Sequence, residues 1–308
     1  MQKLTTLGKV FDRVDEMSAG CYDLNIDVPD VSFDNLDLLR IAGEPHPVRS
    51  VAQRSISNRL GIPYPYLRRC PPDVQALNLN HWITKEKNEK LLFRFDSQDV
   101  RALFTTKYIP VDNFEVCERL DSLGYGLDTE VQCHLDPEFM SLSIPDGAKA
   151  FDINGDKFKP GISISNSEVG LASLSISAFV LRLICTNGLV AKSDVSASYR
   201  HVSTKILSEF PQVLDTVSYE LGTQRSQFKL SMESPVDDPE STLASFNRQF
   251  GLNASEKEAV EWAWPMEMGD TMFAVVNTYT RAAQWNELSA ESSFRLSRVG
   301  GNILGILN

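Results

Sequence analysis

The sequence has few cysteines, and those it has are not arranged in pairs. Five cysteines is an odd number, and no two of them stand at the C-x-x-C spacing that redox and zinc sites use. This excludes the disulfide scaffold of a small secreted protein. We expect reduced thiols and a location in the cytoplasm.

Long apolar runs are also missing. The opening, MQKLTTLGKVFDRVDEM, contains no apolar segment of the kind that a secretory signal needs. The most apolar stretch, residues 171–191, is interrupted by serines, Arg182 and Asn187. A bilayer-spanning helix needs about 20 predominantly apolar residues. We therefore predict a soluble protein without a membrane partner.

The motifs of the common nucleotide-binding and hydrolytic sites are absent too. The sequence has no P-loop, no G-x-G-x-x-G and no G-x-S-x-G. The four histidines are scattered, and none belongs to an H-x-x-x-H or H-E-x-x-H pair. We therefore predict no catalytic residues, no metal site and no cofactor.

One short segment, DINGD, has the oxygen-bearing side chains with which a calcium loop begins. Asp152, Asn154 and Asp156 occupy the first ligand positions. Lys157, however, stands where the loop needs a glycine, and a serine stands where it needs its final glutamate. Asn154 and Gly155 both accept the positive φ of a type I′ turn, so the segment predicts a hairpin.

Charge is unevenly distributed in a chain whose formal net charge is −11. Residues 40–107 hold twelve basic and six acidic side chains, whereas residues 1–39 hold three and eight, and residues 108–150 hold two and nine. A basic segment inside an acidic chain is typical of a local anion-binding surface. The alternative is that its arginines and lysines pair with the acidic flanks. The sequence leaves both interpretations open.

The spacing of apolar residues predicts an α+β fold with a mostly antiparallel central sheet and a helical C-terminal region. Alternation predicts strands over 90–95, 100–106, 141–144, 151–153, 161–165 and 174–185. Helical spacing predicts helices over 50–60, 110–123, 206–221, 238–251, 272–285 and 289–307. A capping box, Ser255-x-x-Glu258, predicts the start of one more helix.

These elements divide the chain into three predicted regions. Residues 1–49 form an acidic N-terminal arm, expected to be extended or irregular because the stretch DLNIDVPDVSFDNLDLL shows weak periodicity. Residues 50–200 form an α+β core domain. Residues 201–308 form a helical region packed on that core.

Arg182 is singled out because its neighbours in the predicted strand are apolar. A guanidinium cannot lose its charge, so a buried one must be paired. Glu168 is the expected partner, and a bound phosphate or nucleic acid is the alternative. Cys185 and His201 are candidates for a nucleophile pair, but nothing in the sequence activates the thiol.

Several segments together resemble a known family. They are LGIPYPYLRR, ALNLNHWI, LLFR followed by VRALFTTKYIPVDNFEV, ISNSEVG, RLICTNGL and NTYTRAA. In this combination and order they resemble the phage/plasmid-like protein family of unknown function, over roughly residues 50–300. The resemblance implies a gene carried by a mobile element in a bacterial host. By association with recombination genes, it implies a role in DNA metabolism.

We therefore predict a mobile-element-encoded nucleic-acid-binding protein that binds or anneals single-stranded DNA in phage or plasmid recombination, and that can form a homo-oligomer. Aromatic side chains between the arginines of the basic segment suit base stacking beside phosphate contacts. One alternative is an enzyme that acts on a phosphate-bearing substrate through Glu168, Arg182 and His201. Another is an acidic interaction or inhibitor protein. The missing catalytic motifs favour a binding protein over an enzyme.

The residues expected to contact nucleic acid are basic or aromatic and lie mainly in the basic segment. They are Arg49, Arg54, Arg59, Tyr66, Arg68, Arg69, Trp82, Arg94, Arg101, Lys107, Tyr108, Arg182, Arg200 and His201. If six phosphates are neutralised, the slope of log affinity against log salt is expected to be about −4.

Overall fold

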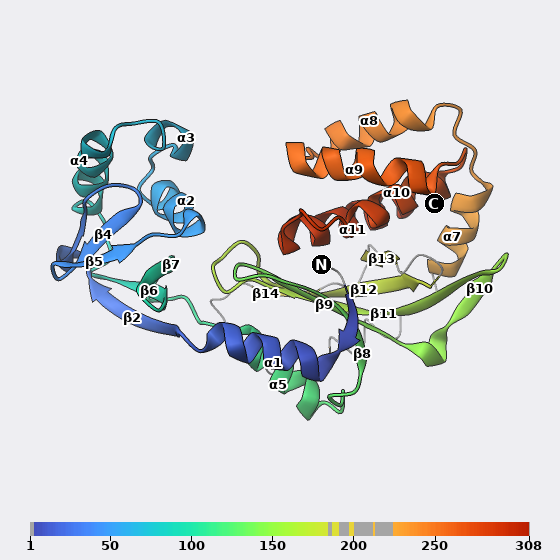
Figure 1. Ribbon diagram of the computed structural model, residues 1–308, viewed down its shortest axis with the longest axis horizontal. Coiled ribbons are helices and arrows are strands. Elements are labelled where there is room, and N and C mark those ends of the chain that lie inside the picture. Colours follow the sequence, from blue (N-terminus) through green and yellow to red (C-terminus); the bar gives the residue numbers. More distant parts are fainter. Residues whose placement is uncertain (1–2, 184–186, 191–196, 200–211, 213–223, 308) are drawn as a thin grey trace.

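Two parts of the molecule, each with its own core, lie side by side (Figure 1). The structure is a computed structural model, and it describes residues 3–183, 187–190, 197–199, 212 and 224–307. The smaller part contains residues 21–105, and the larger part contains an antiparallel sheet with helices packed on it. The fold is therefore α+β, with a mostly antiparallel sheet and a helical C-terminal region, which confirms the predicted fold class.

The smaller part combines two three-stranded antiparallel sheets, in the orders β2-β6-β7 and β3-β4-β5, with three short helices. Its strands are β2 (Cys21–Asp27), β3 (Val31–Phe33), β4 (Leu38–Ile41), β5 (Glu44–Pro47), β6 (Lys90–Asp96) and β7 (Asp99–Thr105). Its helices are α2 (Ser50–Arg59), α3 (Tyr64–Leu67) and α4 (Pro72–Ile83). The strands predicted over 90–95 and 100–106 are thus present as β6 and β7.

The N-terminal residues belong to these layers rather than to a separate arm. β2 pairs along its whole length with β6. The residues before β2 form a strand, β1 (Lys3–Thr6), and a helix, α1 (Leu7–Ser18), which belong to the larger part. The boundary predicted at residue 49 falls inside a single core, because apolar side chains from 28–39 bury against those from 91–103. The weak periodicity of apolar residues over 23–39 therefore reflects several strands separated by turns, and not an irregular segment.

The larger part is built on an antiparallel sheet in the strand order β1-β8-β9-β11-β12-β13, with β10 paired to β11 and β14 paired to β12. Within the described residues its strands after β1 are β8 (Glu130–Leu135), β9 (Met140–Pro145), β10 (Phe151–Ile153), β11 (Asp156–Asn166), β12 (Leu174–Arg182), β13 (Asn187–Val190) and β14 (Ala197–Tyr199). Because β1 pairs with β8, the smaller part is an insertion between two neighbouring strands.

The DINGD segment is a hairpin turn, as predicted. Ile153 of β10 stands opposite Asp156 of β11, so only Asn154 and Gly155 form the connection. Both have positive φ, 54° and 90°. The Gly155 amide also donates a 2.9 Å hydrogen bond to Oδ1 of Asp152. The carboxylate thus stabilises the turn from inside the hairpin.

Serines give one face of the central sheet a polar surface. Two rows cross the strands, Ser143–Ser163–Ser177 and Ser141–Ser165–Ser175. Because successive side chains of a strand point to opposite faces, the residues between them, such as Ile164 and Ile176, lie on the other face, where both are buried. The sheet therefore has a hydroxyl-bearing face and an aliphatic face.

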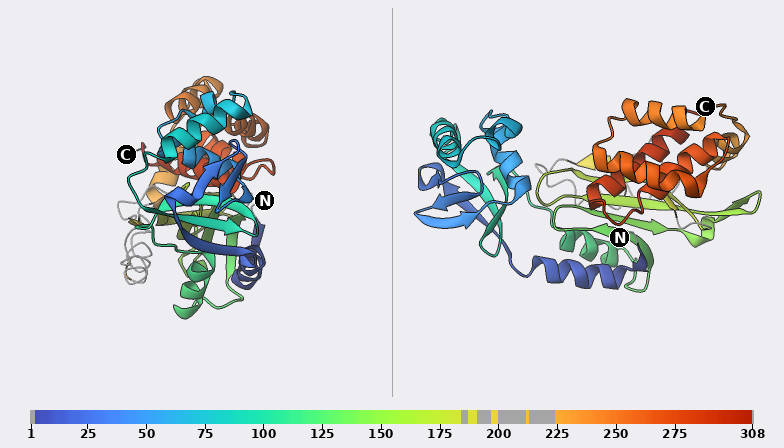
Figure 2. Two further views of the ribbon diagram at one scale, coloured as in Figure 1. Left: turned by 90° about the vertical axis from the view of Figure 1, so that its left-hand side faces the viewer. Right: turned by 45° about the horizontal axis from the view of Figure 1, so that its top comes forward.

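Helices cover both sides of this sheet (Figures 1 and 2). α1 and α5 (Asn113–Ser122) lie on one side of it, and the C-terminal helices lie on the other. Among the described residues the latter are α7 (Gln224–Glu233), α8 (Pro239–Gln249), α9 (Ala254–Glu267), α10 (Met272–Ala282) and α11 (Ala290–Leu304). α11 contacts β8, β9 and β13. The helix predicted over 206–221 lies outside the described residues.

The start of α9 differs from the predicted capping box. Asn253, not Ser255, is the N-cap: its side chain accepts a 2.9 Å hydrogen bond from the Glu256 amide. Oε2 of Glu256 in turn accepts from the Asn253 amide at 2.9 Å. Asparagine caps helices as well as serine does, so the true capping box begins two residues before the predicted one.

No helix in the described part of the chain combines the length and apolar character that crossing a membrane requires.

Candidate functional site

Two arginines of the basic segment are buried between the two parts of the molecule. Arg94 of β6 is only 1% exposed; it donates to Asp23 at 2.9 Å, to Asp112 at 2.5 Å and to the carbonyl of Glu168 at 3.0 Å. Burial alone would lower the pKa of Arg94, but Asp112 and Asp23 outweigh it and raise the pKa further. Arg94 therefore joins the smaller part to the larger one instead of lying on a nucleic-acid-binding surface.

The second buried arginine, Arg101 of β7, is held by Glu168. Its Nη1 donates to Oε2 of Glu168 at 2.6 Å, and the other carboxylate oxygen accepts from the Asn113 amide at 2.7 Å. Nε of Arg101 is buried and has no hydrogen-bond partner in the described structure. Asn166 continues the network by donating to Oδ1 of Asn113 at 2.9 Å. Glu168 is thus the partner of Arg101, not of Arg182.

Three further arginines of the predicted surface are paired with carboxylates at the surface of the smaller part. Arg49 binds Asp96 and Asp99, Arg59 binds Glu86, and Arg68 binds Asp37, at distances of 2.6–3.2 Å. For these three arginines and the two buried ones, the sequence left open that they pair with acidic residues of the same chain rather than bind an anion. The structure shows this pairing, so acidic side chains neutralise much of the positive charge of the basic segment.

Arg182 is paired too, but within the larger part. Its guanidinium donates to both oxygens of Asp156, at 3.1 and 3.0 Å, and to Glu267 at 3.3 Å. It also lies 4.8 Å from the ring centroid of Phe273. The prediction of a carboxylate partner is confirmed, but the partner is wrong, because the β10–β11 hairpin brings Asp156 beside Arg182. Glu168 and Arg182 therefore belong to separate ion-pair clusters. Cys185, Arg200 and His201 lie outside the described residues.

Tyr108 is not available for stacking on a base. Its ring stacks on Phe104 with a centroid distance of 3.8 Å. Burial raises the pKa of Tyr108 to about 12. This tyrosine is part of the packing beside the Arg94 cluster.

What remains of the predicted surface lies mainly on α3 and α4. Tyr66 and Trp82 are each 46% exposed. Arg69 is exposed and, among the described residues, its guanidinium has only the Pro65 carbonyl as partner, at 3.1 Å. Lys85, just after α4, is exposed and pairs with no carboxylate in the same set of residues. We call these four residues, with Leu77 and His81, the α3–α4 surface.

Sequence reasoning missed three members of this surface, Lys85, Leu77 and His81. Leu77 is 71% exposed on α4, although an apolar residue in a helix suggested burial. His81 is exposed one turn later, and its ring lies edge-on to Trp82 at 5.1 Å. The spacing of 77 and 81 was a usable signal, because residues four apart lie on one face of a helix. Of the other predicted cations, Arg54 and Lys107 are exposed and lack a carboxylate partner within the described residues.

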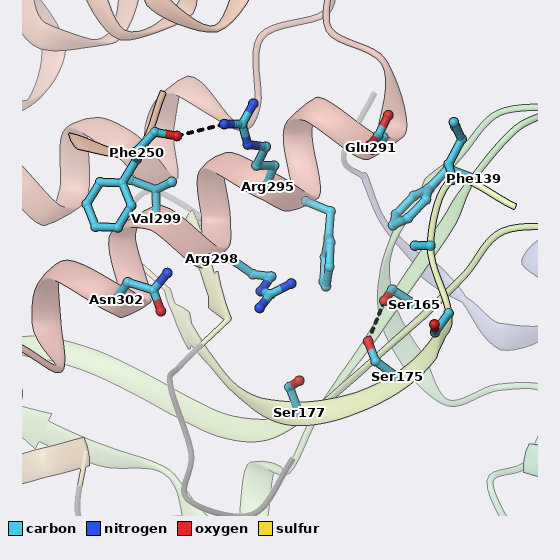
Figure 3. A pocket seen from close by; sticks show the side chains of 14 residues that line it. Phe139, Ser165, Ser175, Ser177, Phe250, Glu291, Arg295, Arg298, Val299 and Asn302 are labelled. Atoms are coloured by element: carbon cyan, nitrogen blue, oxygen red, sulfur yellow. Dashed lines mark hydrogen bonds between the residues drawn. The ribbon is translucent and has the colours of Figure 1, made fainter. Parts of the chain in front are cut away.

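Two cavities lie apart from this surface. One, of about 350 Å³, is lined by Arg101, Glu168 and Cys21 between the two parts. Burial raises the pKa of Cys21, so its thiol is not poised as a nucleophile. The other, of about 450 Å³, lies between α11 and the serine face of the sheet (Figure 3). The described residues contain no group of three or more His, Cys, Asp or Glu side chains placed to hold a metal ion.

His134 of β8 is a buried histidine whose Nε2 has no partner in the described structure. Burial lowers the pKa of His134 to about 3. The native state therefore keeps it neutral, whereas the unfolded chain takes up a proton below about pH 6.5. We expect this group alone to lower the free energy of unfolding by about 1.4 kcal/mol per pH unit as the pH falls from 6.5 towards 3.

Urea unfolding between pH 4.5 and 7.5 measures this contribution. His134→Gln should flatten the acid side of the stability profile relative to the unsubstituted protein, whereas the exposed His81→Gln should leave it unchanged. Equal slopes for the His134→Gln variant and the unsubstituted protein would contradict the assignment.

The fold and these contacts define an α+β protein in which the Arg94 and Arg101 clusters join two parts and in which exposed basic and aromatic residues lie together on α3 and α4. The chain belongs to the family described as Domain of unknown function (DUF932), whose model matches residues 102–284. The match covers Glu168 and the central sheet from β8 to β14, and it leaves out the α3–α4 surface and α11. The chain matches no curated protein and no solved structure.

Proposed function

We propose that the protein binds single-stranded nucleic acid, most directly single-stranded DNA, through the α3–α4 surface. The observation that carries the proposal is the exposure of Tyr66 and Trp82 beside Arg69 and Lys85, cations that lack carboxylate partners among the described residues. Aromatic rings that stack on bases, next to cations that contact phosphates, are the common features of sequence-tolerant single-strand binding.

The aromatic rings favour single strands over a duplex. In a duplex the bases are stacked on one another, so a protein ring cannot reach a base face without opening the helix. The helices α3 and α4 carry Tyr66 and Trp82 on separate segments, joined where Gln75 donates to the carbonyls of Leu67 and Cys70 at 3.2 and 3.0 Å. The spacing of the rings is thereby fixed before a strand arrives.

The family resemblance supports a biological setting for this activity. Segments such as LGIPYPYLRR, which includes Tyr66 and Arg69, resemble phage/plasmid-like proteins. We propose that the protein acts on single-stranded DNA during recombination of a mobile element. Binding without catalysis fits the chemistry of the α3–α4 surface.

The salt dependence of binding tests the proposal. The slope expected from the structure is shallower than the slope expected from the sequence. Because Arg49, Arg59 and Arg68 are already paired, we count three contacts, from Arg69, Lys85 and the neighbouring exposed Lys87. At roughly −0.7 per phosphate on single strands, the slope of log affinity against log salt should be about −2 rather than −4. Fluorescence anisotropy with a labelled oligodeoxythymidine, over a range of NaCl concentrations, measures it.

Two sets of variants separate stacking from charge. Trp82→Ala and Tyr66→Ala should each weaken binding by about 1–3 kcal/mol without changing the salt slope. Arg69→Glu with Lys85→Glu should weaken binding and make the slope shallower. Arg13→Glu, at an exposed position on α1 of the larger part, is the matched control. Unchanged affinity in folded proteins carrying all four α3–α4 substitutions would overturn the proposal.

A further inference from the structure

The cavity between α11 and the central sheet has the composition of a ligand site. It has a volume of about 450 Å³. One wall is α11, with Arg295, Arg298 and Asn302, and the opposite wall is the serine face of β11 and β12 (Figure 3). Small-molecule sites in proteins have volumes of roughly 300–1,000 Å³, so the space suits a compact organic molecule.

The two arginines of α11 in this cavity differ in what they already bind. Arg295 is occupied: it donates to Glu256 at 2.8 Å and to the carbonyls of Phe250 and Gly251 at 2.7 and 2.9 Å. Arg298, one turn later, has no hydrogen bond or ion pair with any described residue, and its side chain points into the space in front of the sheet (Figure 3). Its guanidinium has all its donors available for an anion.

Uncharged polar groups surround the Arg298 guanidinium. Ser177 and Asn302 face the cavity from opposite walls, and the side chain of neither forms a hydrogen bond with another described residue (Figure 3). Ser175 and Ser165 are already linked by a 2.7 Å hydrogen bond. Together they offer donors and acceptors that suit hydroxyl or amide groups of a ligand.

The remaining wall is aromatic. Phe294 of α11 and Phe139, beside β9, pack with ring centroids 5.5 Å apart, and both line the cavity. The carbon Cζ of Arg298 lies 5.9 Å from the Phe294 centroid. A planar ring of a ligand can pack against these phenyl rings while its charged end reaches the guanidinium.

One acidic side chain, Glu291, also lines the cavity. Glu291 is the second residue of α11, two turns before Arg298, which places its Cα about 10 Å away along the helix axis. A carboxylate at this end of the cavity repels an anion. An anionic group is therefore expected at the Arg298 end and not at the Glu291 end.

We propose that this cavity binds a phosphorylated molecule with a planar ring, of the size and chemistry of a nucleoside monophosphate. Arg298 binds the phosphate, since its planar fork matches two phosphate oxygens at once. Ser177 and Asn302 bind the sugar hydroxyls, and the ring packs on Phe139 and Phe294. The ligand is either a free mononucleotide or the phosphorylated terminal nucleotide of a strand. The site is separate from the α3–α4 surface and does not depend on it.

Isothermal titration calorimetry with the four nucleoside 5′-monophosphates tests the proposal. We expect at least one to bind, and its nucleoside and inorganic phosphate to bind at least about ten times more weakly, because each lacks one half of the recognised chemistry. Arg298→Gln should weaken binding of the monophosphate at least about ten-fold. The matched control is Arg248→Gln, at an exposed arginine of α8 that does not line the cavity.

A second variant and a second ligand complete the test. Ser177→Phe should fill the space beside Arg298 and abolish binding while the guanidinium is kept. A 5′-phosphorylated oligothymidine that binds more tightly than the monophosphate, in an Arg298-dependent manner, assigns the site to strand ends; a weaker one assigns it to free nucleotides. Absence of binding by all four monophosphates and by the phosphorylated strand, or binding that Arg298→Gln leaves unchanged, would overturn the proposal. Trp82→Ala should not change the binding of the monophosphates, so failure of this proposal can be distinguished from failure of the proposed function.

Discussion

Replacement of Glu168 by leucine is expected to lower the free energy of unfolding by about 3–5 kcal/mol, because it leaves a buried guanidinium without its counter-charge. Glu168 is the carboxylate that holds Arg101, whose side chain is 5% exposed. Arginine cannot discharge by losing a proton, so the loss cannot be relieved by a pKa shift. The substitution also removes the acceptor of the Asn113 amide at the start of α5.

Urea unfolding curves of three variants separate this effect from a general packing loss. Glu168→Leu combined with Arg101→Leu should recover most of the lost stability, because both charges are then absent. Glu16→Leu removes a carboxylate from the exposed Arg13 pair and should cost less than about 1 kcal/mol. If Glu168→Leu costs no more than Glu16→Leu, the cluster does not hold the two parts together.

Replacement of Arg182 by leucine is expected to have an effect of similar size, about 3–5 kcal/mol, at a separate place in the fold. Its partners Asp156 and Glu267 are 16% and 7% exposed, so the substitution leaves two poorly hydrated carboxylates side by side. The ring of Phe273 also loses its cation. This cluster fixes α9 and α10 to the end of the β10–β11 hairpin.

Double-mutant cycles distinguish the observed partners from the predicted one. Arg182→Leu and Asp156→Leu should couple strongly, since they remove two ends of one ion pair. Arg182→Leu and Glu168→Leu should add to within about 0.5 kcal/mol, as substitutions without shared partners do. Strong coupling between positions 182 and 168 would instead favour the pairing predicted from the sequence.

Local structure was largely predictable from the sequence, because it depends on neighbouring residues. The β6 and β7 strands, the Asn154–Gly155 turn and the helices α10 and α11 all follow from alternation, helical spacing or turn chemistry within a short window. The N-terminal strands were missed for two reasons: β3 has only three residues, and β2 is paired with β6, which lies far along the chain. Their pattern is visible only once β6 is placed beside β2.

The sequence could not predict which arginines of the basic segment form ion pairs, because the pairs connect residues that are distant in the sequence. Asp23 is 71 residues from Arg94, and Glu168 is 67 residues from Arg101. Composition correctly suggested that acidic flanks exist, but it could not choose which arginines they neutralise. The α11 cavity was missed because its walls come from segments that are distant in the sequence. Serines at alternate positions of β11 and β12 indicated a polar face of the sheet, but nothing in the sequence placed Arg298 opposite that face.

The pairing of β1 with β8 has a consequence for the order in which the protein is made. Residues 3–6 leave the ribosome before the smaller part, yet their partners, residues 130–133, emerge only after the whole smaller part has been synthesised. The smaller part has its own core and can fold in the meantime, whereas β1 stays unpaired at least until β8 has emerged. Until it does, β8 presents an open strand edge, the kind of edge that pairs with other chains. Efficient production of the protein therefore depends on how quickly β1 pairs with that edge.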